Sequence, residues 1–187
     1  MDIFRGRITS TGFSTGHGIV IGDWSESKLG NFTNIMWAKP DGTRVLLSPS
    51  AKHAEYVSRI YTFEEVRIVN FEVKRGKREI FVTADALSIR IRWGISLILP
   101  LWRPLWFIAS FEAFFGKLIF GTITHGKTRD GRREWYSVRS ISRVLDAEGS
   151  LNGVSIGSKT KFQNTTFFGF SEPPSMPASV SLKSYIE

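Results

Sequence analysis

The sequence predicts a mainly β protein: an antiparallel, strongly curved sheet or barrel of about ten strands with two short helices. Short segments of alternating apolar residues follow one another along the chain, and turn dipeptides separate them, as at Asp41-Gly42 and Asn152-Gly153. No fixed repeat and no long polar linker divides these segments. We therefore expect a single barrel-like domain over residues 1–187.

The first third of the chain is typical of strands joined by tight bends. Residues 3–9 alternate as a first strand, and the glycines of residues 12–22 are typical of a barrel corner. They do not form a phosphate loop, because no Gly-Lys-Ser/Thr sequence follows them. Residues 31–38 and 43–47 form a predicted hairpin around Pro40-Asp41-Gly42, in which proline sets φ and Asp-Gly tolerates positive φ.

A short helix is expected over residues 49–61, with Ser48 as its cap and Pro49 at its first position. Glu55 and Arg59 lie four residues apart and form a predicted ion pair on its surface. Its predicted buried face consists of Ala54, Val57, Ile60 and Tyr61.

Strand patterns return after this helix and continue to the end of the chain. Residues 87–93 alternate with period two and place Arg90 and Arg92 on the outer face. The remaining predicted strands cover residues 65–73, 78–84, 119–127, 132–143, 148–151, 154–157, 162–170 and 178–186. Asp130-Gly131 and Asn152-Gly153 supply two of the turns between them.

The apolar stretch of residues 93–120 is long enough to suggest a membrane span, but charges and prolines interrupt it. Pro104 fits the first position of a helix over residues 104–118 that is apolar nearly all round. This helix could be buried against the β structure, cover the mouth of a ligand pocket, lie on a membrane surface or form a homodimer interface. The sequence leaves these alternatives open.

Composition narrows the function classes. The net charge is +8, which favours acidic partners, although 17 acidic residues are interspersed with the 25 basic ones. There is no cysteine, so disulfides and thiolate chemistry are excluded. The first residues lack the apolar core of a signal peptide. We expect a cytoplasmic protein, with peripheral membrane contact through residues 104–118 as an open alternative.

The polar residues offer few recognisable sites. The three histidines, His17, His53 and His125, show no metal-ligand spacing, so we expect neither a metal nor a cofactor. The most distinctive polar feature is a basic hairpin tip followed at once by Trp135 and Tyr136. Such a tip can bind phosphate backbones or can be a solvated turn. Its basic residues are Lys127, Arg129, Arg132 and Arg133.

Four segments carry a resemblance to a known family. They are MWAKPDGTRVLLSPS, the short helix that ends before FEEVRI, GKTRDGRREWYSVR and FGFS. In these segments, which span most of the chain, the sequence resembles a family of small actinobacterial proteins of unknown function. The resemblance implies no activity and no catalytic residues. The sequence departs from that family in its apolar segment 93–120, which is richer in aromatic residues.

The first functional hypothesis is a barrel, similar in shape to calycins, that binds a small apolar or amphiphilic ligand. The alternative is an enzyme of isomerase, cyclase or decarboxylase type on such a scaffold, so whether the protein is catalytic stays open. The acid–base candidates are Asp23, His125, Glu134 and Glu172. The expected ligand-lining residues are Trp24, Trp37, Trp93, His125, Trp135, Tyr136 and Arg139.

A third hypothesis is a protein that binds nucleic acid or an anionic membrane surface. It would use the basic hairpin tip together with Arg90 and Arg92. Strand alternation also predicts that Glu134 and Trp135 point to opposite faces of their strand. Glu134 is therefore a pocket residue only if Trp135 is not.

Overall fold

The computed structural model describes residues 1–98, 125–162, 168–169 and 173–187. Among these residues no helix has the length and apolar character needed to cross a membrane. The predicted helix over residues 104–118 and the acid–base candidate Glu172 lie outside the described residues.

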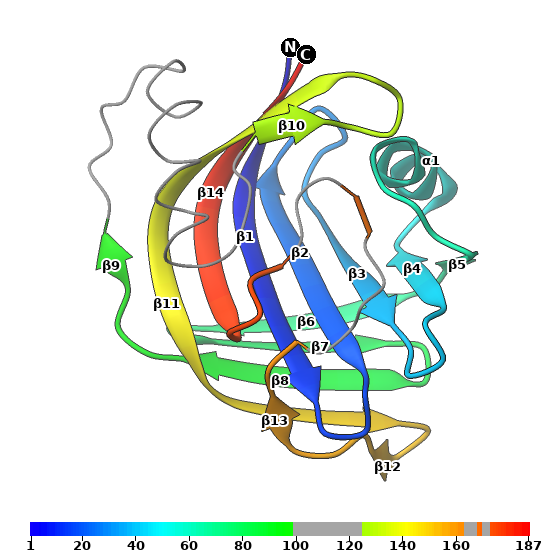
Figure 1. Cartoon of the computed structure of the whole chain (residues 1–187), viewed down its shortest axis with the longest axis vertical. Helices are drawn as coiled ribbons and strands as arrows, with labels where there is room; N and C mark the ends of the chain where they lie inside the picture. The colour runs from blue at the N-terminus through cyan, green and yellow to red at the C-terminus, as the bar shows by residue number, and fades with distance from the viewer. Residues whose placement is uncertain (99–124, 163–167, 170–172) are drawn as a thin grey trace.

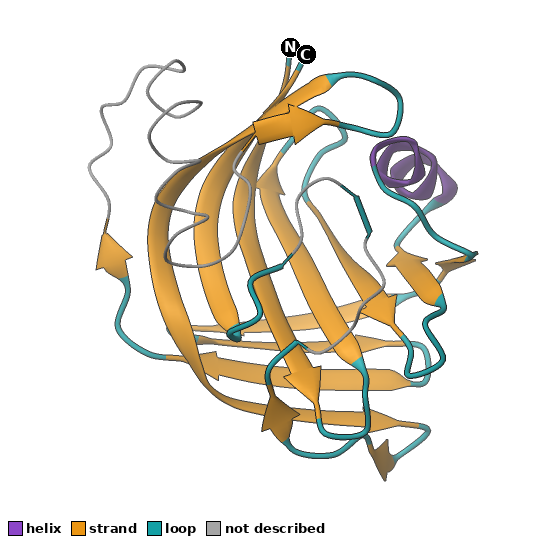
Figure 2. Cartoon of the chain, in the orientation of Figure 1, coloured by secondary structure: helices purple, strands orange, loops and turns teal. Residues whose placement is uncertain are grey.

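Ten strands form one continuous sheet that curls into a half-barrel, as Figures 1 and 2 show. Across the sheet their order is β5-β4-β3-β2-β1-β14-β11-β8-β7-β6. The strands are β1 (Asp2–Phe13), β2 (Gly18–Glu26), β3 (Phe32–Ala38), β4 (Arg44–Ser48), β5 (Glu65–Ile68), β6 (Phe71–Gly76), β7 (Glu79–Ala84), β8 (Leu87–Trp93), β11 (Arg133–Leu151) and β14 (Ala178–Ile186). Four short strands pair beside them: β9 (Leu97–Ile98), β10 (His125–Lys127), β12 (Val154–Ser155) and β13 (Lys159–Thr160). The prediction of a mainly β, strongly curved sheet is confirmed.

The sheet is mixed rather than purely antiparallel, which corrects the prediction. β4 and β5 pair in parallel, from Val45 opposite Glu65 to Ser48 opposite Ile68. A parallel pair needs a long crossover connection, and α1 (Ala51–Ile60) supplies it between these two strands. The predicted strand over residues 162–170 is also wrong where it can be checked, because Phe162, Phe168 and Gly169 lie outside strands.

The predicted turns join antiparallel strands as expected. Gly42 and Gly131 have φ values of 88° and 84°, and Asn152 and Gly153 have 51° and 78°. These left-handed conformations are the ones that glycine and asparagine adopt at low cost, which explains why the turn dipeptides were visible in the sequence.

β11 is a single long strand where the sequence predicted two. Bulges at Arg139 and Leu145 interrupt its pairing with β14 and β8 respectively. Each bulge adds one residue to β11 and so shifts the period-two pattern of side chains. The apparent break in the sequence pattern is therefore a change of register within one strand.

Helix α1 begins at Ala51, two residues later than predicted, because Ser48 and Pro49 belong to the end of β4 and the turn after it. Ser50 is its N-cap residue, and the predicted pair of Glu55 with Arg59 is present. Its buried residues are Ala54, Tyr56, Val57 and Ile60. Three of these were predicted, and Tyr56 was missed.

The two faces of strands β1 to β4 pack against different partners. On one face, which we call the barrel face, Ile21, Ile35 and Leu47 pack with residues of β7 and β8 in one apolar core. On the opposite face, which we call the helix face, Phe4 and Met36 pack with the buried residues of α1 in a second core. The helix face positions the site described next.

Candidate acid–base site on the helix face

The site begins with the alternation of β11. Tyr136 pairs with Ser184 of β14, which in turn pairs with Phe4 of β1, and Glu134 pairs with Ile186. Since Phe4 and Ile186 belong to the core under α1, Glu134 and Tyr136 point toward the helix face. Trp135 points the other way. The alternation predicted from the sequence therefore places Glu134 on the covered side of its strand.

Glu134 is a carboxyl group enclosed by hydroxyl groups. Its residue is only 3 % exposed. Ser184 Oγ donates to Glu134 Oε1 at 2.6 Å, and the Tyr61 hydroxyl donates to Glu134 Oε2 at 3.4 Å. A buried ionised carboxylate needs strong compensation, and neutral hydroxyls provide less of it than a paired cation would.

A second tyrosine extends this hydrogen-bond chain. The hydroxyls of Tyr61 and Tyr136 lie 2.5 Å apart, and either can be the donor. Tyr136 is buried, whereas Tyr61, the residue directly after α1, is only half-buried. Tyr61 is thus the outer member of a group of three side chains that share hydrogen bonds.

These surroundings shift the proton affinity of both buried groups. Burial raises the pKa of Glu134 to about 7, against the lowering effects of hydrogen bonds from Ser184, Tyr136 and Tyr61 and of the charge on Arg132. Burial, together with the charge on Glu134, raises the pKa of Tyr136 well above its usual value. At neutral pH the carboxyl group can therefore exist with or without its proton while Tyr136 stays neutral.

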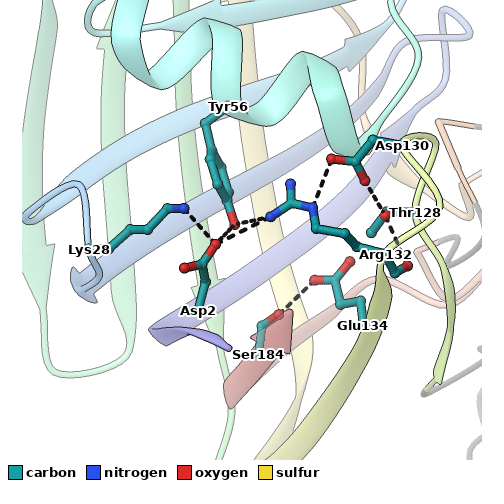
Figure 3. Close-up of polar contacts among 8 residues, drawn as sticks. All are labelled: Asp2, Lys28, Tyr56, Thr128, Asp130, Arg132, Glu134 and Ser184. Carbon is teal, nitrogen blue, oxygen red and sulfur yellow. Dashed lines mark hydrogen bonds and ion pairs between the residues drawn. The ribbon is translucent and has the colours of Figure 1, made fainter. Parts of the chain in front are cut away.

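An ion network lies beside Glu134, as Figure 3 shows. Arg132 contacts Asp2 at 3.2 Å and Asp130 at 2.8 Å, and its guanidinium lies over the ring of Tyr56. Asp2 accepts from the Tyr56 hydroxyl at 2.9 Å and from Lys28 at 2.6 Å. The network joins the first residues of the chain, helix α1 and the β10–β11 turn.

The same network fixes the charge state of Asp2. Its partial burial would raise its pKa, but hydrogen bonds from Lys28 and Tyr56 and the charges of Lys28 and Arg132 outweigh that effect and lower it. Asp2 is thus ionised at neutral pH and holds Arg132 near Glu134. The turn is also fixed to the helix, because the backbone N–H of Arg129 donates to the carbonyl of Ile60 at 3.1 Å.

The predicted ligand-lining residues are distributed over both faces of the sheet. Trp24 and Tyr136 lie on the helix face, where the Trp24 indole donates to Asn34. Trp37 and Trp93 belong to the core of the barrel face, and the Trp37 indole donates to His17 at 3.0 Å. Trp135 points to the barrel face, Arg139 is the bulged residue of β11, and His125 begins β10. The described residues do not bring this predicted set together.

The basic hairpin tip also divides into two kinds of residue. Lys127, Arg129 and Arg133 are exposed, although Arg129 also donates to the carbonyl of Ser58 in α1, whereas Arg132 is half-buried in the ion network. Of the other acid–base candidates, Asp23 binds Arg75 through both carboxylate oxygens on the barrel face. Within the described ranges no three histidine or acidic side chains converge as they would around a metal ion.

Sequence reasoning named Glu134 and Tyr136 but not their partners. Tyr61 was predicted only as part of the buried face of the helix, and Ser184 and Asp2 were not singled out. The contacts of Tyr61 and Ser184 with Glu134 span 73 and 50 positions. No local spacing signals contacts of this length, and the strand alternation of residues 178–186 was the one available indication that Ser184 and Ile186 share a face.

Comparison with known proteins finds likeness in fold alone. A solved structure described as an acetoacetate decarboxylase matches with a TM-score of 0.50 and 11 % identity, over 99 % of this chain and 86 % of its own. An acetoacetate decarboxylase from Legionella pneumophila matches with a TM-score of 0.45 and 9 % identity, over 100 % of this chain and 84 % of its own. No family model and no curated protein matches the chain, so the resemblance to an actinobacterial family stays a prediction.

Proposed function

We propose that this protein is an acid–base enzyme that binds a small carbonyl compound and exchanges a proton with it through Glu134. The observation that carries the proposal is the buried Glu134 carboxyl, which the hydroxyls of Ser184 and Tyr61 contact and whose pKa burial raises to about 7. General acid–base catalysis is most effective when the catalytic pKa lies near the working pH. A strongly perturbed carboxyl surrounded by organised hydrogen-bond donors is also the environment in which catalytic groups concentrate.

The tyrosines give this carboxyl a route to a ligand. Tyr61 is half-buried and bonds both to Glu134 and to Tyr136, so a proton can pass between Glu134 and the outer side of Tyr61 by exchange along hydrogen bonds. Ser184 holds the other oxygen of Glu134 in place. In this arrangement Glu134 sets the proton affinity, and the Tyr61 hydroxyl is the group that would face a carbonyl oxygen or the adjacent carbon.

A β-keto acid is the first substrate to test. This choice rests on the similarity of the fold to a solved structure that is described as an acetoacetate decarboxylase. When a β-keto acid loses CO₂, the electron pair of the broken C–C bond remains on an enolate. That enolate must accept a proton at carbon, which a carboxylic acid with a pKa near 7 can supply.

The test is to incubate the protein with acetoacetate in D₂O and to follow its consumption and the deuterium content of the product by proton NMR. Glu134→Gln should lower the rate by about 10²–10⁴-fold. The control is Glu148→Gln, which changes an exposed carboxylate on the same strand. A wild-type rate equal to that of buffer would contradict the enzyme proposal. Line broadening of acetoacetate without turnover would instead support a binding protein.

A further inference from the structure

The barrel face carries a second group of polar residues that the acid–base site does not use. Three neighbouring strands, β1, β14 and β11, align their side chains there in rows. One row consists of Arg5, Lys183 and Ser137, which pair directly across the strands. The next row toward the chain termini consists of Ile3, Tyr185 and Trp135. A basic row and a largely aromatic row therefore lie side by side on the same face.

A β-bulge adds a third cation. Val138 pairs with Leu182, and Ser140 pairs with Ser181, so Arg139 is the extra residue of β11. In a bulge, two residues of one strand oppose a single residue of the partner strand, and the bulge re-aims a side chain. Leu182 and Ser181, the partners of the residues on either side of Arg139, directly precede Lys183 in β14, so the bulge lies beside Lys183.

The cations of this group are poorly compensated. Arg5 and Lys183 lie directly opposite each other, an arrangement of like charges that destabilises a sheet. Partial burial, Arg5 and Arg139 together lower the pKa of Lys183, and Glu26 is the acidic residue that opposes them. Glu26 forms an ion pair with Arg5, but its side chain is 62 % exposed. Among the described residues, no salt bridge reaches Lys183 or Arg139.

We propose that this surface binds single-stranded nucleic acid, with Arg5, Lys183 and Arg139 at the phosphates and the Trp135–Tyr185 pair beneath the bases. Proteins that bind single strands combine a basic track with aromatic side chains on which bases stack. Along each strand the two rows are separated by about 6.6 Å, the distance between alternate residues. A nucleotide places its base and its phosphate at a comparable separation.

Within the described residues, the remaining features of this face also suit a binding surface. Ile3 is 40 % exposed, and Trp135, Tyr185 and Lys183 are half-buried, so the aromatic row is accessible from one side. Ser137 and Ser181 supply hydroxyl groups beside the cations, and serine hydroxyls commonly donate hydrogen bonds to phosphate oxygens. The net charge of +8 would add long-range attraction for a polyanion.

The test is fluorescence anisotropy with a labelled oligothymidylate of about twelve nucleotides, between about 50 and 200 mM salt. Three phosphate contacts predict a slope of log affinity against log salt of about −2. Lys183→Ala should weaken binding about three- to tenfold and reduce the size of the slope by about 0.7. The matched control is Lys77→Ala in the exposed β6–β7 turn, which should leave both quantities unchanged.

A second variant separates stacking from charge. Trp135→Ala should weaken binding at least about fivefold. The salt slope should stay the same, because Trp135 stacks on a base and makes no contact with a phosphate. Tyr185→Leu serves the same purpose if the melting curve of Trp135→Ala shows a damaged fold. Equal losses in the Lys183 and Lys77 variants would overturn the proposal. So would binding of a duplex as tight as that of the single strand, or the absence of binding at low salt.

Discussion

The phenolic oxygens of Tyr61 and Tyr136 lie 2.5 Å apart although 75 positions separate the two residues in the sequence. Tyr61 follows the last residue of α1, and Tyr136 lies on β11, so this contact joins the helix to the strand that carries Glu134. The position of α1 on the sheet therefore places the Tyr61 hydroxyl against the buried pair of Glu134 and Tyr136. The group of three side chains is complete only when the helix is packed on the sheet.

The raised pKa of Glu134 predicts a pH dependence of stability. Its pKa rises from an ordinary 4.5 to about 7 on folding. Between these values the folded protein holds a proton that the unfolded chain releases, so the free energy of unfolding falls as pH rises. The stability that Glu134 contributes is fully present below about pH 4.5 and is lost as pH passes 7. This loss lowers the free energy of unfolding by about 3 kcal/mol.

Urea denaturation of the wild type and Glu134→Gln at pH values between 4.5 and 7.5 measures this contribution. The difference between the two proteins isolates it from the titration of other groups, and Glu148→Gln provides the control. The free energy of unfolding of the wild type should decline over this pH range, and that of Glu134→Gln should lack this decline. A decline of the same size in both proteins would mean that Glu134 titrates normally in the folded state.

Ser184→Ala should raise the pKa of Glu134 further. The Ser184 hydroxyl is the strongest of the hydrogen-bond donors that stabilise the ionised carboxylate. Without it, the infrared band of the protonated carboxyl should persist to higher pH than in the wild type, and Glu134→Gln identifies that band by its loss. Ser181→Ala removes a hydroxyl from the opposite face of the same strand and should leave the band unchanged.

The fold was largely predictable because its turns are encoded locally. The glycines of the two Asp-Gly turns and both residues of Asn152-Gly153 have positive φ, and strand alternation is visible without knowledge of the partner strands. Two features were hidden. The parallel pairing of β4 with β5 depends on where α1 returns the chain, and the bulge at Leu145 makes one strand look like two.

The site was predictable only in part, for a related reason. Alternation indicates that Glu134 and Trp135 face opposite ways, but it does not show which face is covered. That depends on the packing of α1, through Tyr56 and Ile60, on strands that lie far away in the sequence. The aromatic residues predicted to line one pocket lie on two faces, because tryptophan fills apolar cores as readily as it lines binding sites.

The ion network at Asp2 should contribute measurably to stability. Asp2→Ala would leave the Tyr56 hydroxyl and Arg132 without a shared acceptor, at a cost of about 1–2 kcal/mol at pH 7. Because its pKa is lowered on folding, Asp2 stabilises the protein above about its ordinary 3.8, and this effect is lost as pH falls through the folded value. The destabilisation in urea should therefore shrink in acid.

The control for this measurement is Glu55→Ala, which breaks an exposed ion pair on the same helix. Both side chains of that pair are more than half exposed, so its loss should cost only about 0.3–0.5 kcal/mol. Equal and small effects of the two substitutions would show that the Asp2 network contributes no more to stability than an exposed ion pair.

Gly149 should be intolerant of any side chain, because the barrel core closes directly on it. A Cβ atom at this position would lie 2.7 Å from side-chain carbons of Ile156 and 2.9 Å from the ring of Phe13, both of which are buried. Gly149→Ala should therefore cost about 1–3 kcal/mol through overpacking. Gly131→Ala has open space around it and should cost about 1 kcal/mol, through its positive φ alone.

A double-mutant cycle separates these two causes. Ile156→Ala removes the atoms nearest to the new methyl group, so it should cost less in the Gly149→Ala background than in the wild type. The same Ile156 substitution combined with Gly131→Ala should be additive, since the two residues do not interact. Thermal and urea unfolding of the single and double variants measure both couplings. Additivity at Gly149 would mean that the barrel core relaxes around the extra methyl group, and that its packing against β11 is looser than the contact distances require.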